Sequence, residues 1–410
     1  MKAVLLAGGY GTRLAPITMR IPKVMIPIAG KPSIQHLIEQ LREAGIVEII
    51  LSVNTTQKKI EEYFGNGSTF GVKISYIYEH TKSDAEKPGA VGAINNIIQE
   101  SSKKGAEKDD YIIIGADNFV WGLNLKKFIE FYGEKKAEAA IALYDLPNRS
   151  DVEHFGVVQL DEHERIIRVQ EKPKIEETIS KLASTAIYLM SEKLAFEKLP
   201  DYVKTQKEQN KKPDRIGDMW INFVETNSQV YGFKFSGFWG DVGSAQTYIE
   251  TNKFAMNLIK TKQNGKTMQR IISETAQIDK DAKIKDPVII EDGVKIEKWA
   301  VIGPYTHIMK NSTVHEGARV SNSIVFENAV IEKKAEVEEA IIDCRAHVKE
   351  EAKIESYSII GFASKAGKKT RVMPRSKLMP FIELNDNTIL EGEAKLSINC
   401  DKIEDELKRN

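Results

Sequence analysis

The chain has 410 residues, of which 41% are hydrophobic, and its 59 basic residues balance its 59 acidic ones. This length exceeds what one ordinary domain needs, so two domains are expected. Because the net charge is zero, no global field favours nucleic acid or an anionic membrane, and any anion must be bound by a local site. A small-molecule partner is therefore expected, with no nucleic acid and no membrane involved.

The two cysteines, Cys344 and Cys400, exclude a disulfide framework and a cysteine-type zinc site. The N-terminus has one lysine and a short apolar run without a cleavage pattern, and no segment approaches the ~18 apolar residues that span a membrane. These observations predict a cytoplasmic protein.

The first predicted element is a buried strand, Ala3–Ala7, which leads directly into a glycine-rich loop. Glycines let backbone N–H groups approach an anion, and two cations close behind the loop, Arg13 and Lys23, can neutralise charge on phosphoryl oxygens. The combination predicts a polyphosphate site. The spacing matches neither a P-loop nor a dinucleotide fingerprint.

Taken whole, the segment from Leu6 to Pro32 resembles the signature of the sugar-1-phosphate nucleotidylyltransferases, which reads L-A-G-G-x-G-T-R-L-x-P-x-T followed by P-K-x-x-x-P-x-x-x-K-P. In this sequence it stands as LAGGYGTRLAPIT and PKVMIPIAGKP. The resemblance implies the transfer of a nucleotidyl group to a sugar 1-phosphate.

The first 250 residues alternate short apolar runs with helical patterns. The predicted strands are Ala3–Ala7, Glu48–Val53, Lys73–Tyr78 and Tyr111–Gly115, and the predicted helices are Pro32–Ala44, Gln57–Phe64 and Val91–Ser101. Such alternation predicts an α/β, Rossmann-like fold with a mixed, mostly parallel sheet. Ligands of these sheets bind at the carboxyl ends of strands, where both the Gly8–Gly9 turn and Asp117 are expected.

From about residue 270 an apolar residue recurs at every sixth position. The series runs Ile278, Ile284, Ile290, Ile296, Ile302, Ile308, Val314, Val320 and Phe326, and after single-residue slips Ile331, Val337, Ile342, Val348, Ile354 and Ile360. A period of six is typical of hexapeptide repeats, in which each unit forms one face of a triangular coil. It predicts a left-handed parallel β-helix of about five coils, a fold that stacks well against copies of itself in a homo-oligomer.

These patterns divide the chain into four parts. A nucleotidyltransferase domain is expected over residues 1–255, a linker helix over 256–270, the β-helix over 271–361, and a cap or tail over 362–410 with a helix at Lys402–Lys408.

The resemblance also implies roles for individual residues. Asp117 in Gly-Ala-Asp-Asn and Asp241 in Trp-Gly-Asp-Val-Gly match the metal-binding aspartates of the family, so Mg²⁺ is the expected cofactor. Arg13, Lys23 and Asp117 are the expected catalytic residues. The nucleotide is expected on Leu6, Ala7, Gly8, Gly9, Gly11, Thr12, Gly89 and Gly92.

The sugar phosphate is expected on Gly156, Glu171, Lys172 and Thr185, within segments that resemble the Y-G-V-V, E-K-P and sugar-pocket elements of the family. The base is less defined, because Gly92 stands where short-form thymidylyltransferases carry glutamine. The sequence favours a glucose-1-phosphate thymidylyltransferase, with mannose-1-phosphate guanylyltransferase or a UTP-dependent relative as alternatives.

Two further functions remain open at this point. Many hexapeptide proteins are acyltransferases, and His315 and His347 of the β-helix could then act as bases. A non-catalytic regulator is the other alternative, since subunits of a translational exchange factor share this layout. The presence of Arg13, Lys23 and both aspartates disfavours it.

Overall fold

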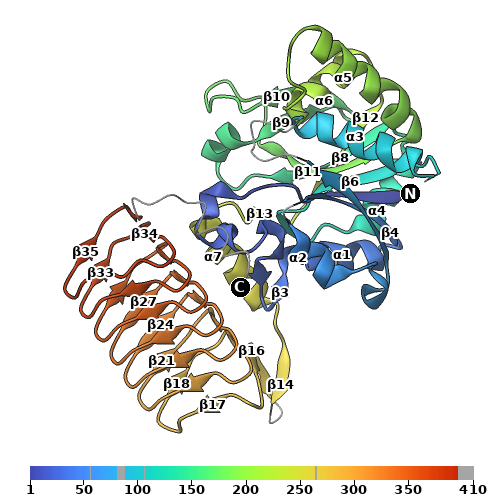
Figure 1. The fold of residues 1–410 in the computed structure, drawn as a ribbon. Coiled ribbons are helices and arrows are strands. Elements are labelled where there is room, and N and C mark those ends of the chain that lie inside the picture. Colours follow the sequence, from blue (N-terminus) through green and yellow to red (C-terminus); the bar gives the residue numbers. More distant parts are fainter. Residues whose placement is uncertain (56, 81–87, 106, 264–265, 396–410) are drawn as a thin grey trace. The chain divides into compact units, whose positions relative to one another are not determined.

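The computed structural model describes residues 1–55, 57–80, 88–105, 107–263 and 266–395. The chain forms two compact units, and a segment near the N-terminus belongs to the second of them. The sheet unit comprises residues 1–10 and 33–240, and the β-helix unit comprises residues 11–32 together with the chain from 241 onwards (Figure 1).

The sheet unit is built on one large mixed sheet. Its strands are β1 (Lys2–Leu6), β4 (Glu48–Asn54), β5 (Lys73–Glu79), β6 (Tyr111–Gly115), β8 (Ala139–Asp145), β9 (Gly156–Leu160), β10 (Ile166–Glu171), β11 (Leu182–Met190) and β12 (Val230–Phe235). The order is β10-β9-β11-β6-β1-β4-β5, and β8 pairs with β11 and β12. β1, β4, β5 and β6 are mutually parallel, whereas β11 runs against β6. The mostly parallel α/β sheet is therefore confirmed.

Helices of the described residues flank this sheet on both faces. They are α1 (Ser33–Glu43), α2 (Lys58–Phe64), α3 (Ala90–Lys103), α4 (Leu125–Glu134), α5 (Leu199–Glu208) and α6 (Ile216–Glu225). α3, α5 and α6 pack on one face through an apolar cluster that contains Val4, Ile113 and Trp220. The ribbon shows α1, α2 and α4 on the other face (Figure 1). A short pair, β7 (Asn118–Trp121) and β13 (Phe238–Asp241), lies beside the sheet. No helix in the described parts of the chain combines the length and apolarity that crossing a membrane requires.

All seven elements predicted up to residue 115 form, with ends displaced by at most two residues. The apolar periodicity reports burial directly in these segments: the strand residues Ala3, Val4 and Leu5 are fully buried, as are Ile112–Ile114.

The β-helix unit stacks its strands into three parallel sheets of eight, six and seven strands. The first sheet holds β16 (Arg270–Ile272), β19 (Val288–Ile290), β22 (Thr306–Ile308), β25 (Ile324–Val325), β28 (Ile341–Ile342), β31 (Ile359–Ile360), β34 (Lys377–Leu378) and β36 (Glu393–Ala394). The second holds β17 (Gln277–Ile278), β20 (Lys295–Ile296), β23 (Thr313–Val314), β26 (Val330–Ile331), β29 (His347–Val348) and β32 (Lys365–Ala366). The third holds β18 (Lys283–Ile284), β21 (Val301–Ile302), β24 (Arg319–Ser321), β27 (Glu336–Glu338), β30 (Lys353–Ile354), β33 (Arg371–Val372) and β35 (Ile389–Leu390).

The residues spaced by six form the core of this left-handed β-helix, with one exception. Ile302, Val314 and Ile342 point inward and are fully buried. Phe326 was expected among them, but Val325 fills the inward position, because the one-residue slip comes one repeat earlier than predicted. Phe326 instead lies in the turn that follows β25.

Two of the expected boundaries also differ. The coils do not end at residue 361, because Ala366, Val372, Leu378 and Leu390 continue the buried row. The series was missed where an alanine replaces the larger aliphatic residues. The linker is not a helix over 256–270: α7 (Ala245–Asn257) ends near its start, and the hairpin β14 (Thr261–Gln263) and β15 (Lys266–Met268) follows. The helix expected at 402–408 lies outside the described residues.

The corners of the coils have a left-handed backbone that recurs at the same period. Positive φ angles occur at Trp299, Tyr305, Asn311, Asn322, Asn328, Lys334, Glu339, Arg345, Glu351, Tyr357, Ala363, Lys369, Arg375, Phe381 and Asn387. A non-glycine residue there costs about 1–2 kcal/mol relative to the right-handed region. The stacked apolar core must offset this repeated cost.

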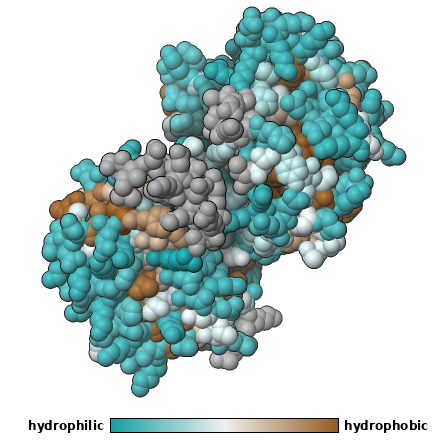
Figure 2. Space-filling model, viewed as in Figure 1, coloured by the Kyte–Doolittle hydropathy of each residue, from teal (hydrophilic) through white to brown (hydrophobic). Residues whose placement is uncertain are grey.

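The outward positions differ between the faces of the β-helix. On the first sheet, Ile324, Ile341 and Ile359 face outward yet are at most 1% exposed. On the third sheet, charged residues such as Arg319 and Lys353 occupy the outward positions. Figure 2 shows many hydrophilic side chains on the visible face of the β-helix unit. One face is thus an internal packing surface and another is a solvated one.

The inward row can be tested with one substitution at two places. Ile342→Ala opens a cavity in a fully buried position and should destabilise the β-helix by about 2–5 kcal/mol. Ile389→Ala, at an outward position that is 70% exposed, should change stability by less than about 0.5 kcal/mol. Thermal unfolding followed by circular dichroism compares the two, and equal shifts would contradict the assignment of the inward row.

Candidate active site

The glycine-rich loop and Asp117 lie at the same edge of the sheet. β1 and β6 are adjacent and parallel, with Leu6 opposite Gly115, and the N–H of Ala116 donates to the Leu6 carbonyl at 3.1 Å. The chain therefore leaves two neighbouring strands at their carboxyl ends, first into Gly8–Gly9 and then into Asp117. This is where ligands of such sheets bind.

The loop after β1 is fixed by residues at the end of β4. The side-chain amide of Gln57 donates to the Gly9 carbonyl at 3.2 Å, and that of Asn54 donates to the Tyr10 hydroxyl at 2.9 Å. A Cβ at Gly8 would lie 2.8 Å from the carboxylate of Glu79, which Ser52 holds through a hydrogen bond. A side chain at position 8 would therefore displace the Glu79 carboxylate.

Asp117 is oriented by a chain of two hydrogen bonds. The side-chain amide of Asn118 donates to the Gly115 carbonyl at 2.8 Å and to Asp117 Oδ1 at 3.3 Å. The indole N–H of Trp239 in turn donates to Asn118 Oδ1 at 2.7 Å. Asn118 is 4% exposed, so its partners fix it, and it fixes the Asp117 carboxylate.

Arg13, Lys23 and Asp241 belong to the β-helix unit. The Arg13 side chain is 75% exposed and its Nη2 lies 3.6 Å from Asp241 Oδ2, a solvated contact that leaves the guanidinium accessible to a ligand. Lys23 is 7% exposed. Gly11 packs beside it at φ +66°, where a Cβ would lie 2.8 Å from Thr18 and 3.1 Å from Lys23.

The second expected nucleotide segment precedes α3. Gly89 has φ +85°, and a Cβ on it would lie 2.5 Å from the Pro213 carbonyl. The N–H of Gly92 donates to that same carbonyl at 3.1 Å, and the N–H of Ala90 donates to Asp214 at 3.2 Å. Both glycines are thus packed against the loop before α6, and the close backbone approach at Gly89 requires a glycine there.

Glu171 lies at the end of β10, opposite Gly156 on β9. Its carboxylate lies over Gly217 in the first turn of α6, where any side chain would clash with it. Burial raises the pKa of Glu171, the neighbouring Lys172 lowers it, and Asp218 raises it further, with a net upward direction. Lys172 itself is exposed, so the pair presents one partly buried acceptor and one solvated cation.

Thr185 is placed differently from the other expected sugar-binding residues. It is fully buried, and its hydroxyl donates to the Ala142 carbonyl at 2.8 Å. It lies at the irregularity of β11 between Ser184 and Tyr188. Because its hydroxyl is buried and bonded within the sheet, Thr185 does not present that hydroxyl to a sugar phosphate.

The donor set fits a magnesium ion that shares its coordination with substrate. Within the described ranges, no group of three or more His, Cys, Asp or Glu side chains could hold a metal alone. Mg²⁺ binds through one or two carboxylates plus phosphates and water. In the sheet unit, the carboxylate of Asp117 is oriented by Asn118. In the β-helix unit, the side chain of Asp241 is 41% exposed.

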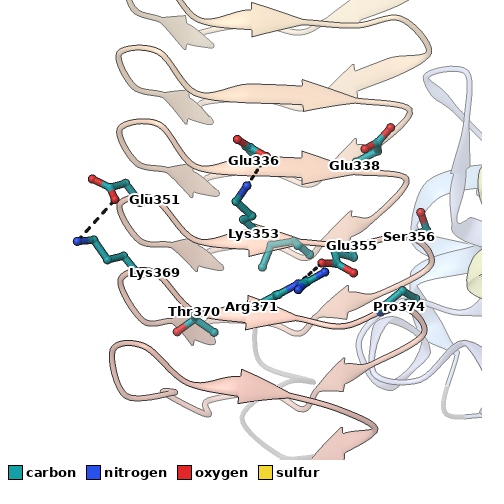
Figure 3. Close-up of a pocket in the computed structure, with 11 residues that line it drawn as sticks. Glu336, Glu338, Glu351, Lys353, Glu355, Ser356, Lys369, Thr370, Arg371 and Pro374 are labelled. Atoms are coloured by element: carbon teal, nitrogen blue, oxygen red, sulfur yellow. Dashed lines mark hydrogen bonds and ion pairs between the residues drawn. The ribbon is translucent and has the colours of Figure 1, made fainter.

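The β-helix offers a pocket of its own, but each of the three cations that line it is paired with a carboxylate. Figure 3 shows Lys353 directed to Glu336, Lys369 to Glu351 and Arg371 to Glu355 across successive coils. The two histidines considered as bases are similarly placed. His315 lies 3.0 Å from Glu297 and His347 lies 2.7 Å from Glu332. These pairs connect neighbouring coils, and none of them provides an unbalanced charge for a substrate phosphate.

The N-terminal part of the chain matches the nucleotidyl transferase family over residues 2–257, and residues 284–394 match the GMPPB C-terminal domain. The chain belongs to the sugar-1-phosphate nucleotidyltransferases. The glycine loop at the edge of the sheet is thus the signature loop of a nucleotidyltransferase.

Relatives of this transferase align over much of the chain. A UTP–glucose-1-phosphate uridylyltransferase of Synechocystis is 32% identical over 79% of this chain and 82% of its own length. A glucose-1-phosphate thymidylyltransferase of Streptomyces griseus is 27% identical over 77% and 84%, respectively. A crystal structure from Bacillus anthracis, described as a glucose-1-phosphate thymidylyltransferase with sucrose, superposes with a TM-score of 0.54 at 26% identity. It covers 64% of this chain and 98% of its own.

Sequence reasoning missed the residues that support the site. Trp239 stood inside a recognised motif, but its bond to Asn118 joins positions 121 residues apart. Gln57 and Asn54, which hold the glycine loop, had the ordinary appearance of a strand end followed by a helix start. A polar residue directly after a predicted strand was the only signal available for them.

The Trp239–Asn118 bond can be tested with a conservative substitution. Trp239→Phe leaves the buried Asn118 carbonyl without its donor, which costs about 1–3 kcal/mol. We expect kcat/KM of nucleotidyl transfer to fall about tenfold or more. Trp121→Phe on β7, where the tryptophan is 49% exposed, is the matched control and should have wild-type activity. Wild-type kcat/KM in Trp239→Phe would contradict the orienting role.

Proposed function

We propose that the enzyme converts a pyrimidine nucleoside triphosphate, dTTP or UTP, and glucose 1-phosphate into an NDP-glucose and pyrophosphate. The observation that carries the site is the pairing of β1 with β6, which brings the glycine loop and Asp117 to one edge of the sheet. The sugar and the class of base rest on the relatives, which are named as acting on glucose 1-phosphate with uridylyl or thymidylyl transfer.

In the proposed reaction, a phosphate oxygen of the sugar phosphate forms a bond to the α-phosphorus while the bond from that phosphorus to the pyrophosphate oxygen breaks. The attacking oxygen is already anionic, so no general base is needed, and the contribution of the protein is positioning and electrostatics. The N–H groups of Gly8, Gly9 and Gly11 would bind the nucleotide, Arg13 the leaving pyrophosphate and Lys23 the α-phosphate. Magnesium, when bound by Asp117 and Asp241, would neutralise phosphate charge.

On the sugar side, Glu171 would accept hydrogen bonds from sugar hydroxyls and Lys172 would pair with the sugar phosphate. The position of the Glu171 carboxylate over Gly217 and opposite Gly156 supports this assignment, since two glycines leave room around a partly buried acceptor.

The substrates can be identified with one panel. The panel combines dTTP, UTP, GTP, CTP and ATP with the 1-phosphates of glucose, mannose, galactose and N-acetylglucosamine. We expect pyrophosphate release with Mg²⁺ to be fastest for dTTP or UTP with glucose 1-phosphate. GTP with mannose 1-phosphate as the best pair would overturn the proposed specificity. No release from any pair would overturn the proposed activity.

The charged residues can be tested individually. Arg13→Ala and Asp117→Ala should each lower kcat by about a hundredfold or more, as expected for loss of one transition-state contact. The controls Arg42→Ala and Asp201→Ala replace exposed residues on α1 and α5 and should retain wild-type kcat. Retained turnover in Arg13→Ala and Asp117→Ala would refute their roles.

A further inference from the structure

The segment that carries Arg13 and Lys23 is attached to the β-helix through its own residues. Residues 11–32 form one compact unit with the chain from 241 onwards. Arg20, between the two signature cations, donates to Asp343 Oδ1 at 2.6 Å, across 323 positions of sequence. The Arg20 side chain is 9% exposed and that of Asp343 is fully buried.

Asp343 lies directly after β28, among outward positions that are otherwise apolar. Its neighbours on that sheet, Ile324, Ile341 and Ile359, are at most 1% exposed. Burial raises the pKa of Asp343, and the charge and hydrogen bond of Arg20 oppose this shift, with a net upward direction. A buried carboxylate among isoleucines is costly unless it is paired.

Two aromatic rings complete the environment of Arg20. The guanidinium lies 5.6 Å from the ring centre of Phe326 and 5.8 Å from that of Phe362. Phe326 and Asp343 occupy equivalent turns of successive coils, because β25 pairs with β28, and Phe362 follows the next strand, β31. The register slip places Phe326 outside the core of the β-helix, where its ring contacts the guanidinium of Arg20.

A second attachment involves Arg13 directly. Lys377 on β34, the strand after β31 in the same sheet, donates from Nζ to the Arg13 carbonyl at 3.0 Å. The end of the segment is held in turn by α7: the Tyr248 hydroxyl donates to the Pro27 carbonyl at 2.7 Å, and the N–H of Ala29 donates to Asn252 at 2.8 Å. The segment is therefore attached at Arg13, between its two cations and after Lys23.

We propose that the β-helix positions residues 11–32. Arg20, Asp343 and Lys377 act as positioning residues that hold Arg13 and Lys23 in place for nucleotidyl transfer. None of the three touches the reacting atoms in this proposal. It rests on the proposed function for the roles of Arg13 and Lys23, whereas the attachment itself can be measured without turnover. The consequence is that the β-helix contributes to catalysis from outside the sheet unit.

The test uses two variants of the full-length enzyme. Lys377→Met removes the bond to the Arg13 carbonyl at a partly buried position. The double variant Arg20→Met/Asp343→Asn removes both buried charges together, so that neither is left unpaired, and asparagine keeps an acceptor for the N–H of Cys344. Each should unfold within a few degrees of wild type.

Two matched controls lie elsewhere on the β-helix. Lys353→Met replaces a strand lysine of the third sheet that pairs with Glu336 at 3.2 Å. Arg270→Met/Asp286→Asn removes an ion pair of 2.7 Å at the first strand of the β-helix. Neither of these two ion pairs includes a residue of the segment 11–32.

Hydrogen exchange of the backbone amides in residues 11–32 provides a readout independent of catalysis. We expect faster exchange in both test variants and wild-type exchange in both controls. In pyrophosphate release, kcat/KM for the nucleotide should fall about 10- to 100-fold in the test variants only, the loss expected when reacting groups are misplaced.

Unchanged exchange in the test variants would overturn the attachment. Faster exchange with wild-type kcat/KM would overturn the positioning role. If the wild-type enzyme released no pyrophosphate with any substrate pair, the proposed function would fail, and the exchange data would still decide whether the β-helix holds the segment.

Discussion

The parallel pairing of β1 with β6 is the constraint on which the candidate site depends. Register places Leu6 opposite Gly115, and the two chain exits that follow become a glycine loop and the turn that carries Asp117. No side chain has to reach far, because the backbone of the sheet itself brings the two motifs to one edge. The surrounding residues then refine the arrangement: Gln57 and Asn54 fix the loop, and Asn118 with Trp239 fixes the carboxylate.

The β-helix follows a different logic, in which one local rule is repeated. A buried aliphatic residue, two strand residues and a left-handed corner recur every six positions, and each coil buries its core only against the next. The outward positions are free of this rule, so the chain can make one face apolar and another charged. An outward position can therefore hold a carboxylate such as that of Asp343, which binds the guanidinium of Arg20.

The sequence predicted those features that depend on neighbouring residues. The strands and helices up to residue 115, the glycine loop and most of the six-residue row are visible in local periodicity. It failed where the structure depends on distant partners. Phe326 was assigned to the core because it fits the period, yet a one-residue slip turns it towards Arg20. The coils after residue 361 were missed because Ala366 weakens the apolar signal without interrupting the stacking. Trp239 and Asp343 gave no local sign of their partners.

The stacking also determines which changes of length the protein can tolerate. A whole coil can be gained or lost without disturbing the register of the three sheets, and each such event moves everything beyond it by one strand spacing of about 4.8 Å. An event after β34 leaves α7 and the partners of Arg20 and Arg13 together. An event before β25 would shift those partners relative to α7, which holds Pro27 and Ala29. Between Asp343 and Lys377, which lie two strands apart, it would separate them by more than the length of a hydrogen bond. Insertions and deletions of coils during evolution are therefore expected to spare the coils up to Lys377 and to accumulate at the C-terminal end of the solenoid.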